Sequence, residues 1–165
     1  MTLCPRIAAE EHGATFVRYI AAGPDPKSPP RPGPEPDRDA REAPGRKKIM
    51  VIEDDPIVSM AIENLLAEAG YVVLLSCARG EDAPALAERQ RPDLILADVK
   101  LAGTMDGVEA VAAIRARSDV PVIFVTAHTD PATRERMRAV APADVLAKPV
   151  PEFLLVRAVA AALRG

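Results

Sequence analysis

The sequence predicts an α/β protein in which helices cover both faces of a doubly wound parallel sheet. Two observations carry this prediction. Between residues 47 and 165, short apolar runs alternate five times with segments whose apolar residues recur at helical spacing. The apolar runs are continuous, which is typical of strands that are buried on both faces. Because parallel crossovers are right-handed, few topologies remain, and the doubly wound one is favoured.

The first strand and helix have clear boundary residues. Residues 49–52 form the first apolar run, and Glu53, Asp54, Asp55 and Pro56 follow it. Asp55 before Pro56 predicts a helix N-cap with proline at the first helical position. The helix should end at Gly70, since glycine favours the C-terminal cap. Its apolar positions are Ile57, Val58, Ala61, Ile62, Leu65, Leu66 and Ala69.

The other elements follow in the same alternation. Further strands are expected over residues 71–76, 94–97, 120–125 and 144–147, and further helices over 80–90, 107–117, 129–140 and 151–164. Pro84 is compatible with its helix only in the first turn. Thr129 or Asp130 should cap the helix that begins near Pro131. The candidates for the inner face of the last helix are Phe153, Leu154, Val156, Val159 and Leu163.

Composition and charge exclude several classes of protein. The net charge of −3 argues against electrostatic binding to nucleic acid or to an anionic membrane. No stretch approaches the ~18 apolar residues of a membrane span, and Glu10, Glu11 and His12 interrupt any secretory apolar segment. Two cysteines are too few for a disulfide framework. We therefore expect a cytoplasmic protein.

Residues 1–46 differ from the rest of the chain. They hold 9 of the 17 prolines, and 7 of these lie between Pro24 and Pro36. Closely spaced prolines remove backbone donors and favour extended chain. We expect residues 1–46 to be a Pro-rich, disordered extension or an over-long assigned start, with a docking ligand as the alternative, and residues 47–165 to be the domain.

Polar residues follow the predicted strands at the end where they should converge. Asp98 ends the third strand, Thr126 follows the fourth and Lys148 follows the fifth, while Glu53 and Asp54 follow the first. Ligands of such sheets bind at the carboxyl ends of the strands. Crowded carboxylates need a cation, and oxygen ligands with retained waters suit Mg²⁺. Lys148 and Thr126 offer an ammonium and a hydroxyl to an oxyanion.

Each of these pieces is weak when taken alone. Acidic residues after a strand are often helix caps, a lone threonine is usually a cap, and Lys-Pro is usually a turn. Their combination, in this order and spacing, is much more specific.

The set Glu53-Asp54, Asp98, Thr126-Ala127 and Lys148-Pro149 resembles the signature of bacterial response-regulator receiver domains, over roughly residues 47–165. The resemblance implies a flavodoxin-like (βα)5 fold with strand order 2-1-3-4-5. It also implies a role for each residue of the set. Asp98 matches the phosphoacceptor, Thr126 the switch hydroxyl and Lys148 the phosphate-pairing lysine. Asp54 and Glu53 match the direct and water-mediated Mg²⁺ ligands, Asp98 also faces the metal, and Lys100 matches the residue whose backbone carbonyl completes the site. Asp106-Gly107 matches the turn before the third helix, and the Lys148–Pro149 bond should be cis.

The resemblance further implies partners and a mode of action. The phosphoryl donor would be a histidine kinase or a histidine phosphotransfer protein, and phosphorylation would rearrange the face of the fourth helix, fifth strand and fifth helix towards an unknown protein target. A homodimer through the fourth and fifth helices is an option within the family. Since no output domain follows the last helix, we expect a stand-alone, chemotaxis-regulator-like receiver that acts as a phosphorelay shuttle, as a phosphate sink or as a regulator that binds a target protein. It would catalyse only its own phosphotransfer and dephosphorylation and would bind neither DNA nor membrane directly.

The chain departs from the family pattern at several positions. Val145 stands where receivers carry an aromatic residue, so the usual switch through that ring is in doubt. The loop after Asp98 is one residue longer than the common form and has Ala102 in place of a proline. Lys100 and His128 flank the site at positions that influence phosphoryl lifetime in the family.

Three competing functions are less well supported. A phosphohydrolase would carry a second aspartate two positions after Asp98, where Lys100 stands. A flavin or dinucleotide binder would need a Gly-rich or Ser/Thr-rich loop after the first strand, where acidic residues stand instead. A degenerate receiver that works unphosphorylated would not need the full acidic set with Thr126 and Lys148.

Overall fold

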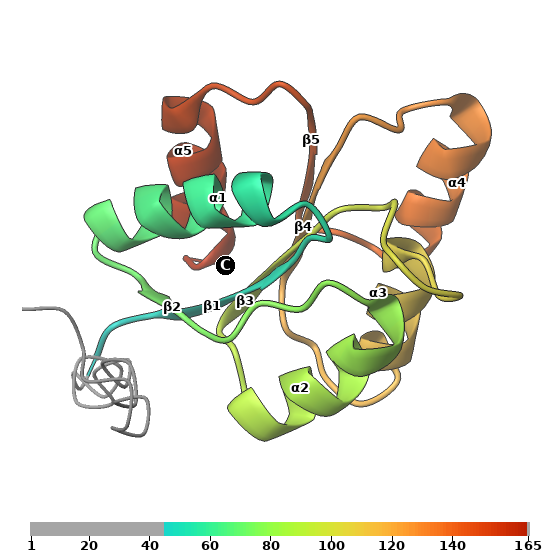
Figure 1. Ribbon diagram of the computed structural model, residues 1–165, viewed down its shortest axis with the longest axis horizontal. Helices are drawn as coiled ribbons and strands as arrows, with labels where there is room; N and C mark the ends of the chain where they lie inside the picture. Colours follow the sequence, from blue (N-terminus) through green and yellow to red (C-terminus); the bar gives the residue numbers. More distant parts are fainter. Residues whose placement is uncertain (1–44, 165) are drawn as a thin grey trace, which may run out of the picture. The chain divides into compact units, whose positions relative to one another are not determined.

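The computed structural model describes residues 45–164, and these form a five-stranded parallel sheet in the order β2-β1-β3-β4-β5 (Figure 1). The strands are β1 (Lys48–Ile52), β2 (Val72–Val73), β3 (Leu94–Ala97), β4 (Val122–Thr126) and β5 (Asp144–Ala147). The helical elements are α1 (Pro56–Glu68), the 3-10 turn η2 (Gly80–Asp82), α2 (Ala83–Gln90), α3 (Gly107–Arg115), α4 (Pro131–Ala139) and α5 (Glu152–Ala162). The predicted flavodoxin-like topology and strand order are therefore confirmed.

The register of the sheet aligns the carboxyl ends of its central strands. Ile52 pairs with Ala97 across β1 and β3, and Thr126 pairs with Ala147 across β4 and β5. Glu53, Asp98 and Lys148 each follow directly on one of these paired residues. The sheet geometry alone therefore delivers three charged side chains to one rim.

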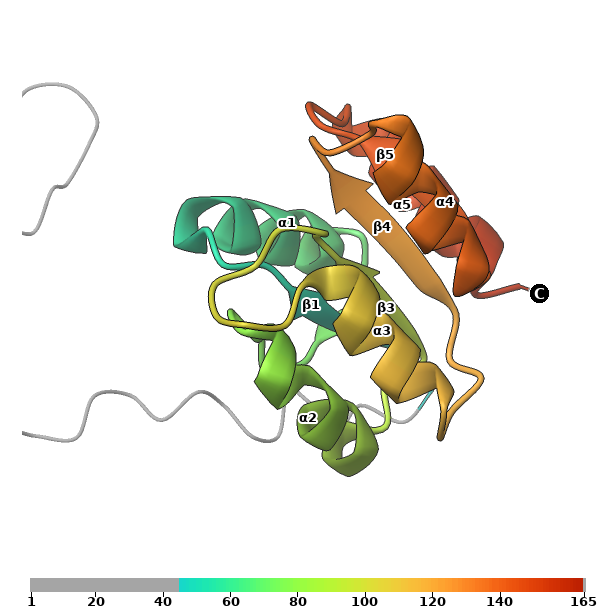
Figure 2. The same ribbon diagram turned by 90° about the vertical axis from the view of Figure 1, so that its right-hand side faces the viewer.

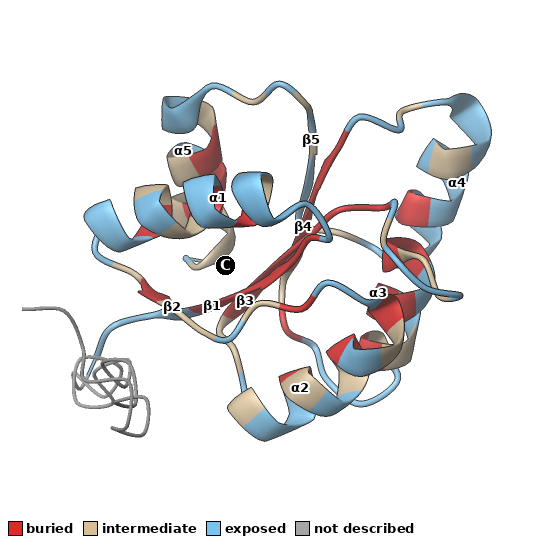
Figure 3. Cartoon of the chain, in the orientation of Figure 1, coloured by how far each residue is buried: buried red, intermediate tan, exposed pale blue. Residues whose placement is uncertain are grey.

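Two hydrophobic cores lie on opposite faces of the sheet, because successive strand residues point to opposite sides (Figures 2 and 3). Helices α1 and α5 cover one face, and α2, α3 and α4 cover the other. Each core contains large side chains with no exposed surface. On the face covered by α1 and α5 these include Ile49, Leu66 and Ile123, and on the other face they include Met50, Ile95 and Phe124. Each contributes about 1.5–3 kcal/mol of burial free energy, which makes the sheet a firm platform for its rim.

The helix caps follow the sequence closely. Asp55 caps α1 by accepting hydrogen bonds from the N–H groups of Ile57 and Val58, and Pro56 begins the helix as predicted. Asp130, one of the two predicted candidates, caps α4 by accepting from the Thr133 N–H. Ile57 itself is 72% exposed and does not belong to the inner face of α1.

Two predicted elements differ from expectation by more than a few terminal residues. The strand over residues 71–76 is reduced to Val72–Val73, although the chain runs on beside β1 and forms an isolated bridge between Cys77 and Ile52. The helix over residues 80–90 is divided into η2 and α2. Pro84 lies in the first turn of α2 as predicted, and since proline has no N–H it cannot bond back to Gly80 and continue one α-helix across the junction.

The predicted inner face of α5 is partly wrong. Phe153 is 68% exposed, while Leu155 and Ala158, which were not predicted, are buried beside Val159. Apolar residues at 153–156 surround the start of this helix on all sides, so helical spacing does not distinguish the inner from the outer face.

The predicted extension over residues 1–46 lies outside the described residues, except for Gly45 and Arg46. The Arg46 side chain donates a hydrogen bond of 2.9 Å from Nε to the Gly70 carbonyl, after the end of α1. Within residues 45–164, no helix has the length and apolar character needed to cross a membrane.

Candidate functional site

Three of the predicted site residues meet at the carboxyl rim of the sheet. The Nζ of Lys148 lies 2.7 Å from Glu53 Oε2 and 2.7 Å from Asp98 Oδ2. Both carboxylates are buried, Glu53 at 5% and Asp98 at 9% exposed, whereas the Lys148 side chain is 22% exposed. One ammonium therefore bridges two buried carboxylates that would otherwise repel each other.

Backbone hydrogen bonds that continue the sheet hold these three residues in place. The Asp98 N–H donates to the Ile52 carbonyl at 2.9 Å, and the Glu53 N–H donates to the Cys77 carbonyl at 2.9 Å. The Lys148 N–H donates to the Thr126 carbonyl at 2.9 Å. The predicted cis peptide bond between Lys148 and Pro149 is present. The site residues thus lie one step beyond the strands and share their rigidity.

The Asp98 carboxylate has two differently engaged oxygens. Its Oδ1 accepts hydrogen bonds from the backbone N–H groups of Val99 at 2.5 Å and Lys100 at 3.3 Å, while Oδ2 faces Lys148. The Gly107 N–H donates to the Val99 carbonyl at 2.8 Å, which draws the start of α3 against the backbone that carries Asp98. The carboxylate is therefore oriented from both sides.

Burial and charge act on the site in opposite directions. Burial raises the pKa of the Glu53 carboxyl, and it outweighs the lowering by Lys148. Burial is the largest single influence on the pKa of Lys148 and by itself would lower it, but the hydrogen bonds and negative charges of Asp98 and Glu53 together outweigh burial and raise that pKa. Lys148 is accordingly a fixed positive charge at neutral pH, while Glu53 is a carboxylate whose ionisation is disfavoured.

Thr126 is fully buried at the end of β4, next to the loop that leads to α4. Its Oγ1 accepts a hydrogen bond from the backbone N–H of His128 at 3.1 Å. Because the hydroxyl accepts here, its own proton remains free to be donated. Ala127 and His128 are exposed, and Val145 of β5 is 37% exposed.

The predicted metal ligands are brought together only in part. Residues 45–164 contain no group of three acidic, histidine or cysteine side chains arranged to hold a metal ion, so Glu53, Asp54 and Asp98 do not form a closed three-carboxylate cage. Asp54 is exposed, and Lys148 lies between the other two. The donors are nevertheless all hard oxygens beside solvent. They fit Mg²⁺, which keeps several waters and needs only one or two carboxylates from the protein.

Two polar contacts around the site were not predicted. Glu81 of η2 accepts hydrogen bonds from the N–H and the hydroxyl of Thr104, at 2.6 and 2.7 Å, and so holds the loop that follows Asp98. Arg136 of α4 donates to Asp106 Oδ2 at 2.7 Å. The partners are 23 and 30 positions apart, and exposed charged residues at such separations leave no periodic signal in the sequence.

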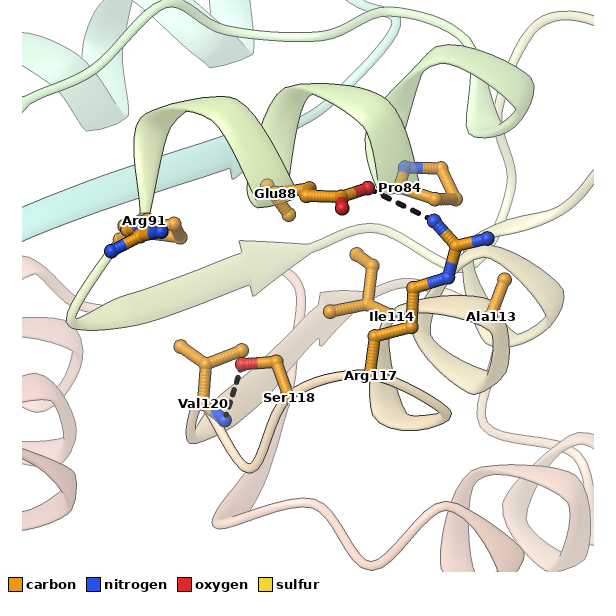
Figure 4. Close-up of a pocket in the computed structure, with 10 residues that line it drawn as sticks. Pro84, Glu88, Arg91, Ala113, Ile114, Arg117, Ser118 and Val120 are labelled. Atoms are coloured by element: carbon orange, nitrogen blue, oxygen red, sulfur yellow. Dashed lines mark hydrogen bonds and ion pairs between the residues drawn. The ribbon is translucent and has the colours of Figure 1, made fainter.

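Among the hollows on the surface of residues 45–164, one lies away from the site and another adjoins it. A cavity of about 420 Å³ between α2 and α3, crossed by the Glu88–Arg117 ion pair, includes none of the predicted site residues (Figure 4). A mainly apolar groove of about 540 Å³ between α1 and α5 is lined in part by Ile62, Leu155 and Lys148. The exposed side chains of Ile57 and Met60 belong to the same helix, α1.

Comparison with known proteins gives a consistent result. The family model described as "Response regulator receiver domain" matches residues 49–160. "Transcriptional regulatory protein PdtaR" of Mycobacterium tuberculosis is 31% identical over 117 residues, which are 71% of this chain and 55% of the relative. The phyllosphere-induced regulator PhyR of Methylorubrum extorquens is 38% identical over 104 residues, 62% of this chain and 38% of the relative. The chain thus spans about half or less of these curated relatives.

Solved structures agree with this result. The signal receiver domain of a modulated diguanylate cyclase from Desulfovibrio desulfuricans is 34% identical, with a TM-score of 0.69 over 72% of this chain and 94% of that one. The receiver domain of the sensor histidine kinase PA1611 from Pseudomonas aeruginosa is 35% identical, with a TM-score of 0.66 over 73% of this chain and 99% of that one. That second structure is described with a magnesium ion coordinated in its active-site cleft.

Proposed function

Because this chain belongs to the response regulator receiver domain family, we propose that Asp98 accepts a phosphoryl group from a phosphohistidine and that the modified protein signals through a changed surface. The donor would be a histidine kinase or a histidine phosphotransfer protein. One observation carries the proposal: the Lys148 ammonium lies 2.7 Å from Asp98 Oδ2, at a carboxylate that is oriented and buried yet reachable from the rim. An anionic group added to Asp98 meets a cation already in place.

Phosphoryl transfer requires of the protein mainly that it position the reacting groups and stabilise the charge on the phosphoryl oxygens. A carboxylate oxygen of Asp98 forms a bond to phosphorus as the bond between phosphorus and the histidine nitrogen breaks. The electron pair of the broken bond stays on the imidazole, and the product is an acyl phosphate on Asp98. Lys148 stabilises the negative charge on the phosphoryl oxygens.

Glu53, Asp54, Asp98 and the backbone carbonyl of Lys100 are the groups that would hold Mg²⁺. When bound, this ion supplies further positive charge to the phosphoryl oxygens. The raised pKa of Glu53 supports this assignment, because a carboxylate whose ionisation is disfavoured by burial gains from an added cation.

Thr126 would respond to the new phosphoryl group. Its free hydroxyl proton can be donated to a phosphoryl oxygen, and its existing bond to the His128 N–H would carry the following loop with it. Val145 has no aromatic ring that could move together with Thr126. The response would therefore reach α4 and α5 through the backbone of the loop after β4 rather than through an aromatic side chain of β5.

The groove between α1 and α5 supports docking of the donor protein beside the site. It is mainly apolar and includes Lys148, while Ile57 and Met60 stand 72% and 58% exposed on α1. Exposed apolar side chains next to a concave surface are typical of protein–protein contacts. We place this encounter in the cytoplasm, with an unidentified protein as the downstream target and self-association through α4 and α5 as a second option.

The test is incorporation of one phosphoryl group from acetyl phosphate with Mg²⁺, followed by intact-mass spectrometry. The wild-type protein should gain the group, and hydroxylamine should remove it because an acyl phosphate is labile to nucleophiles. Asp98→Asn should gain none. Asp144→Asn, which alters an exposed aspartate where β5 begins, should be labelled like the wild type. Equal labelling of Asp98→Asn would exclude the assignment.

A further inference from the structure

We propose that the ion pair between Arg136 and Asp106 couples α4 to the loop that carries Asp98, so that α4 senses the state of Asp98 without an aromatic residue in β5. The inference rests on the proposed role of Asp98 as phosphoacceptor. It gives Arg136 a positioning role that neither the family pattern nor the sequence spacing indicated.

Helix α4 has few contacts that fix its position. Met137 is the one buried residue between Pro131 and Ala139, and the outer surface of the helix is almost entirely exposed (Figure 3). Most of its remaining side chains are charged or small, so apolar burial does not hold the rest of the helix. An element of this kind belongs to the low-stability part of a fold, and a single added contact can decide where it lies.

Asp106 is a rigid partner for Arg136. Its Oδ1 accepts from the Glu109 N–H at 2.9 Å, and the Glu109 carboxylate accepts from the Asp106 N–H at 2.9 Å, which forms a complete capping box at the start of α3. The second oxygen, Oδ2, is the one that binds Arg136 at 2.7 Å. Because the aspartate is already ordered by its cap, less side-chain entropy is lost in forming the ion pair.

The path from Asp106 to Asp98 is short and made of backbone. Gly107, next to Asp106, donates its N–H to the Val99 carbonyl at 2.8 Å, and its Cα packs against the Asp98 carbonyl oxygen. A shift of the Asp98–Val99 backbone on phosphorylation would therefore move Asp106. The pair with Arg136 then favours one position of α4 in each state, which is the requirement for coupling two sites.

The pair is half-exposed, with the Arg136 and Asp106 side chains 46% and 30% exposed. Such pairs are weak, which suits a contact that must re-form in more than one arrangement. The ion pair is therefore proposed as a coupling element and not as a main support of the fold.

The first measurement uses the unphosphorylated, full-length protein and needs no phosphodonor. In Arg136→Ala, amide hydrogen exchange should become about two- to fivefold faster in residues 131–139 and also in 99–107, as loss of a weak ion pair predicts. Arg138→Ala is the matched control, since Arg138 lies on the same helix and pairs only with Glu135, at 3.5 Å, within residues 45–164. Unchanged exchange in 99–107 of Arg136→Ala, or equal changes in Arg138→Ala, overturns the proposal.

The second measurement compares exchange in residues 131–139 before and after acetyl phosphate with Mg²⁺. The wild type and Arg138→Ala should show the same change in α4. Arg136→Ala should be labelled to the same extent at Asp98 but lose most of that change. A full α4 response in Arg136→Ala overturns the coupling. If wild-type Asp98 takes no label, the proposed function fails, and the first measurement alone decides whether the two segments are coupled.

Discussion

Gly107 lies so close to Asp98 that a β-carbon at position 107 would stand 1.8 Å from the Asp98 carbonyl oxygen. The first turn of α3 can approach the end of β3 only because this position lacks a side chain. Together with the Gly107 N–H bond to the Val99 carbonyl, this contact fixes the backbone from which the Asp98 carboxylate projects.

Gly107→Ala should therefore displace the Asp98 backbone and lower the free energy of unfolding by about 1–3 kcal/mol, since the clash is with backbone that cannot rotate away. The rate of labelling by acetyl phosphate should fall with it. Urea denaturation and mass spectrometry measure the two effects. Gly70→Ala is the control: Gly70 has a φ of +91° but open space around its Cα, so it should lose about 1 kcal/mol of stability from strain alone and keep its labelling rate.

Glu53→Gln tests the burial of the first acidic residue. A carboxyl whose pKa is raised in the folded state above 4.5 makes the folded protein bind more protons than the unfolded one just above pH 4.5. Stability from this group is lost as the pH rises through that window. As the pH is raised from 4 to 7, the urea midpoint of the wild type should therefore decrease relative to that of Glu53→Gln. Asp54→Asn controls for the loss of one negative charge, and a pH-independent difference for Glu53→Gln would contradict the prediction.

Lys148→Ala should leave the fold intact, with an unchanged circular dichroism spectrum at 20–25 °C, but blunt phosphorylation and any phosphorylation-dependent binding. Removing the ammonium leaves two buried carboxylates without a cation, which costs about 1–3 kcal/mol at this partly exposed site. The loss should be larger at pH 7.5 than at pH 5, because the pKa of Glu53 rises further without its lysine. Lys148→Arg keeps the charge and should retain more of the stability. Labelling of Lys148→Ala at the wild-type rate would count against the role of the ammonium.

Glu81→Ala should loosen the loop after Asp98. The N–H and hydroxyl of Thr104 lower the pKa of Glu81 to about 2, so the clamp contributes stability above pH 4.5 that is lost as the pH falls towards 2. Carboxyl chemical shifts should record this titration directly. In Glu81→Ala the amides of residues 101–105 should exchange faster, while Asp82→Ala, one residue away, should leave them unchanged. Protected amides in Glu81→Ala would show that other contacts hold the loop.

Much of the architecture could be predicted because a strand that is buried on both faces of a parallel sheet has a continuous run of apolar residues in its sequence. The strand over residues 94–97, which is buried throughout, matches the prediction residue for residue. The strand over residues 144–147 also matches, although it lies at the edge of the sheet and is mostly exposed. The rim positions of Glu53, Asp98 and Lys148 follow from the ends of the strands. The edge strand β2 was over-extended because an apolar run does not reveal how many residues actually pair with β1.

The surroundings of the site could be predicted less well. The contacts of Glu81 with Thr104 and of Arg136 with Asp106 depend on the tertiary arrangement of loops and helices. The sequence pattern of exposed polar residues does not specify their partners. The α5 residues show the same limit for apolar side chains, since Phe153 and Leu155 are alike in sequence terms and opposite in exposure.

The Lys148 side chain binds two residues that precede it by 95 and 50 positions, Glu53 near the start of the domain and Asp98 near the middle of its sequence. Contacts of such sequence separation can form only when the intervening chain is closed into loops, which costs conformational entropy. A chain that has assembled β1, β3 and β4 but not β5 has its acidic residues in place and no cation to neutralise them. The proposed phosphorylation of Asp98 therefore requires the fifth strand as well as the third, because Lys148 at the end of β5 supplies the cation beside Asp98 Oδ2.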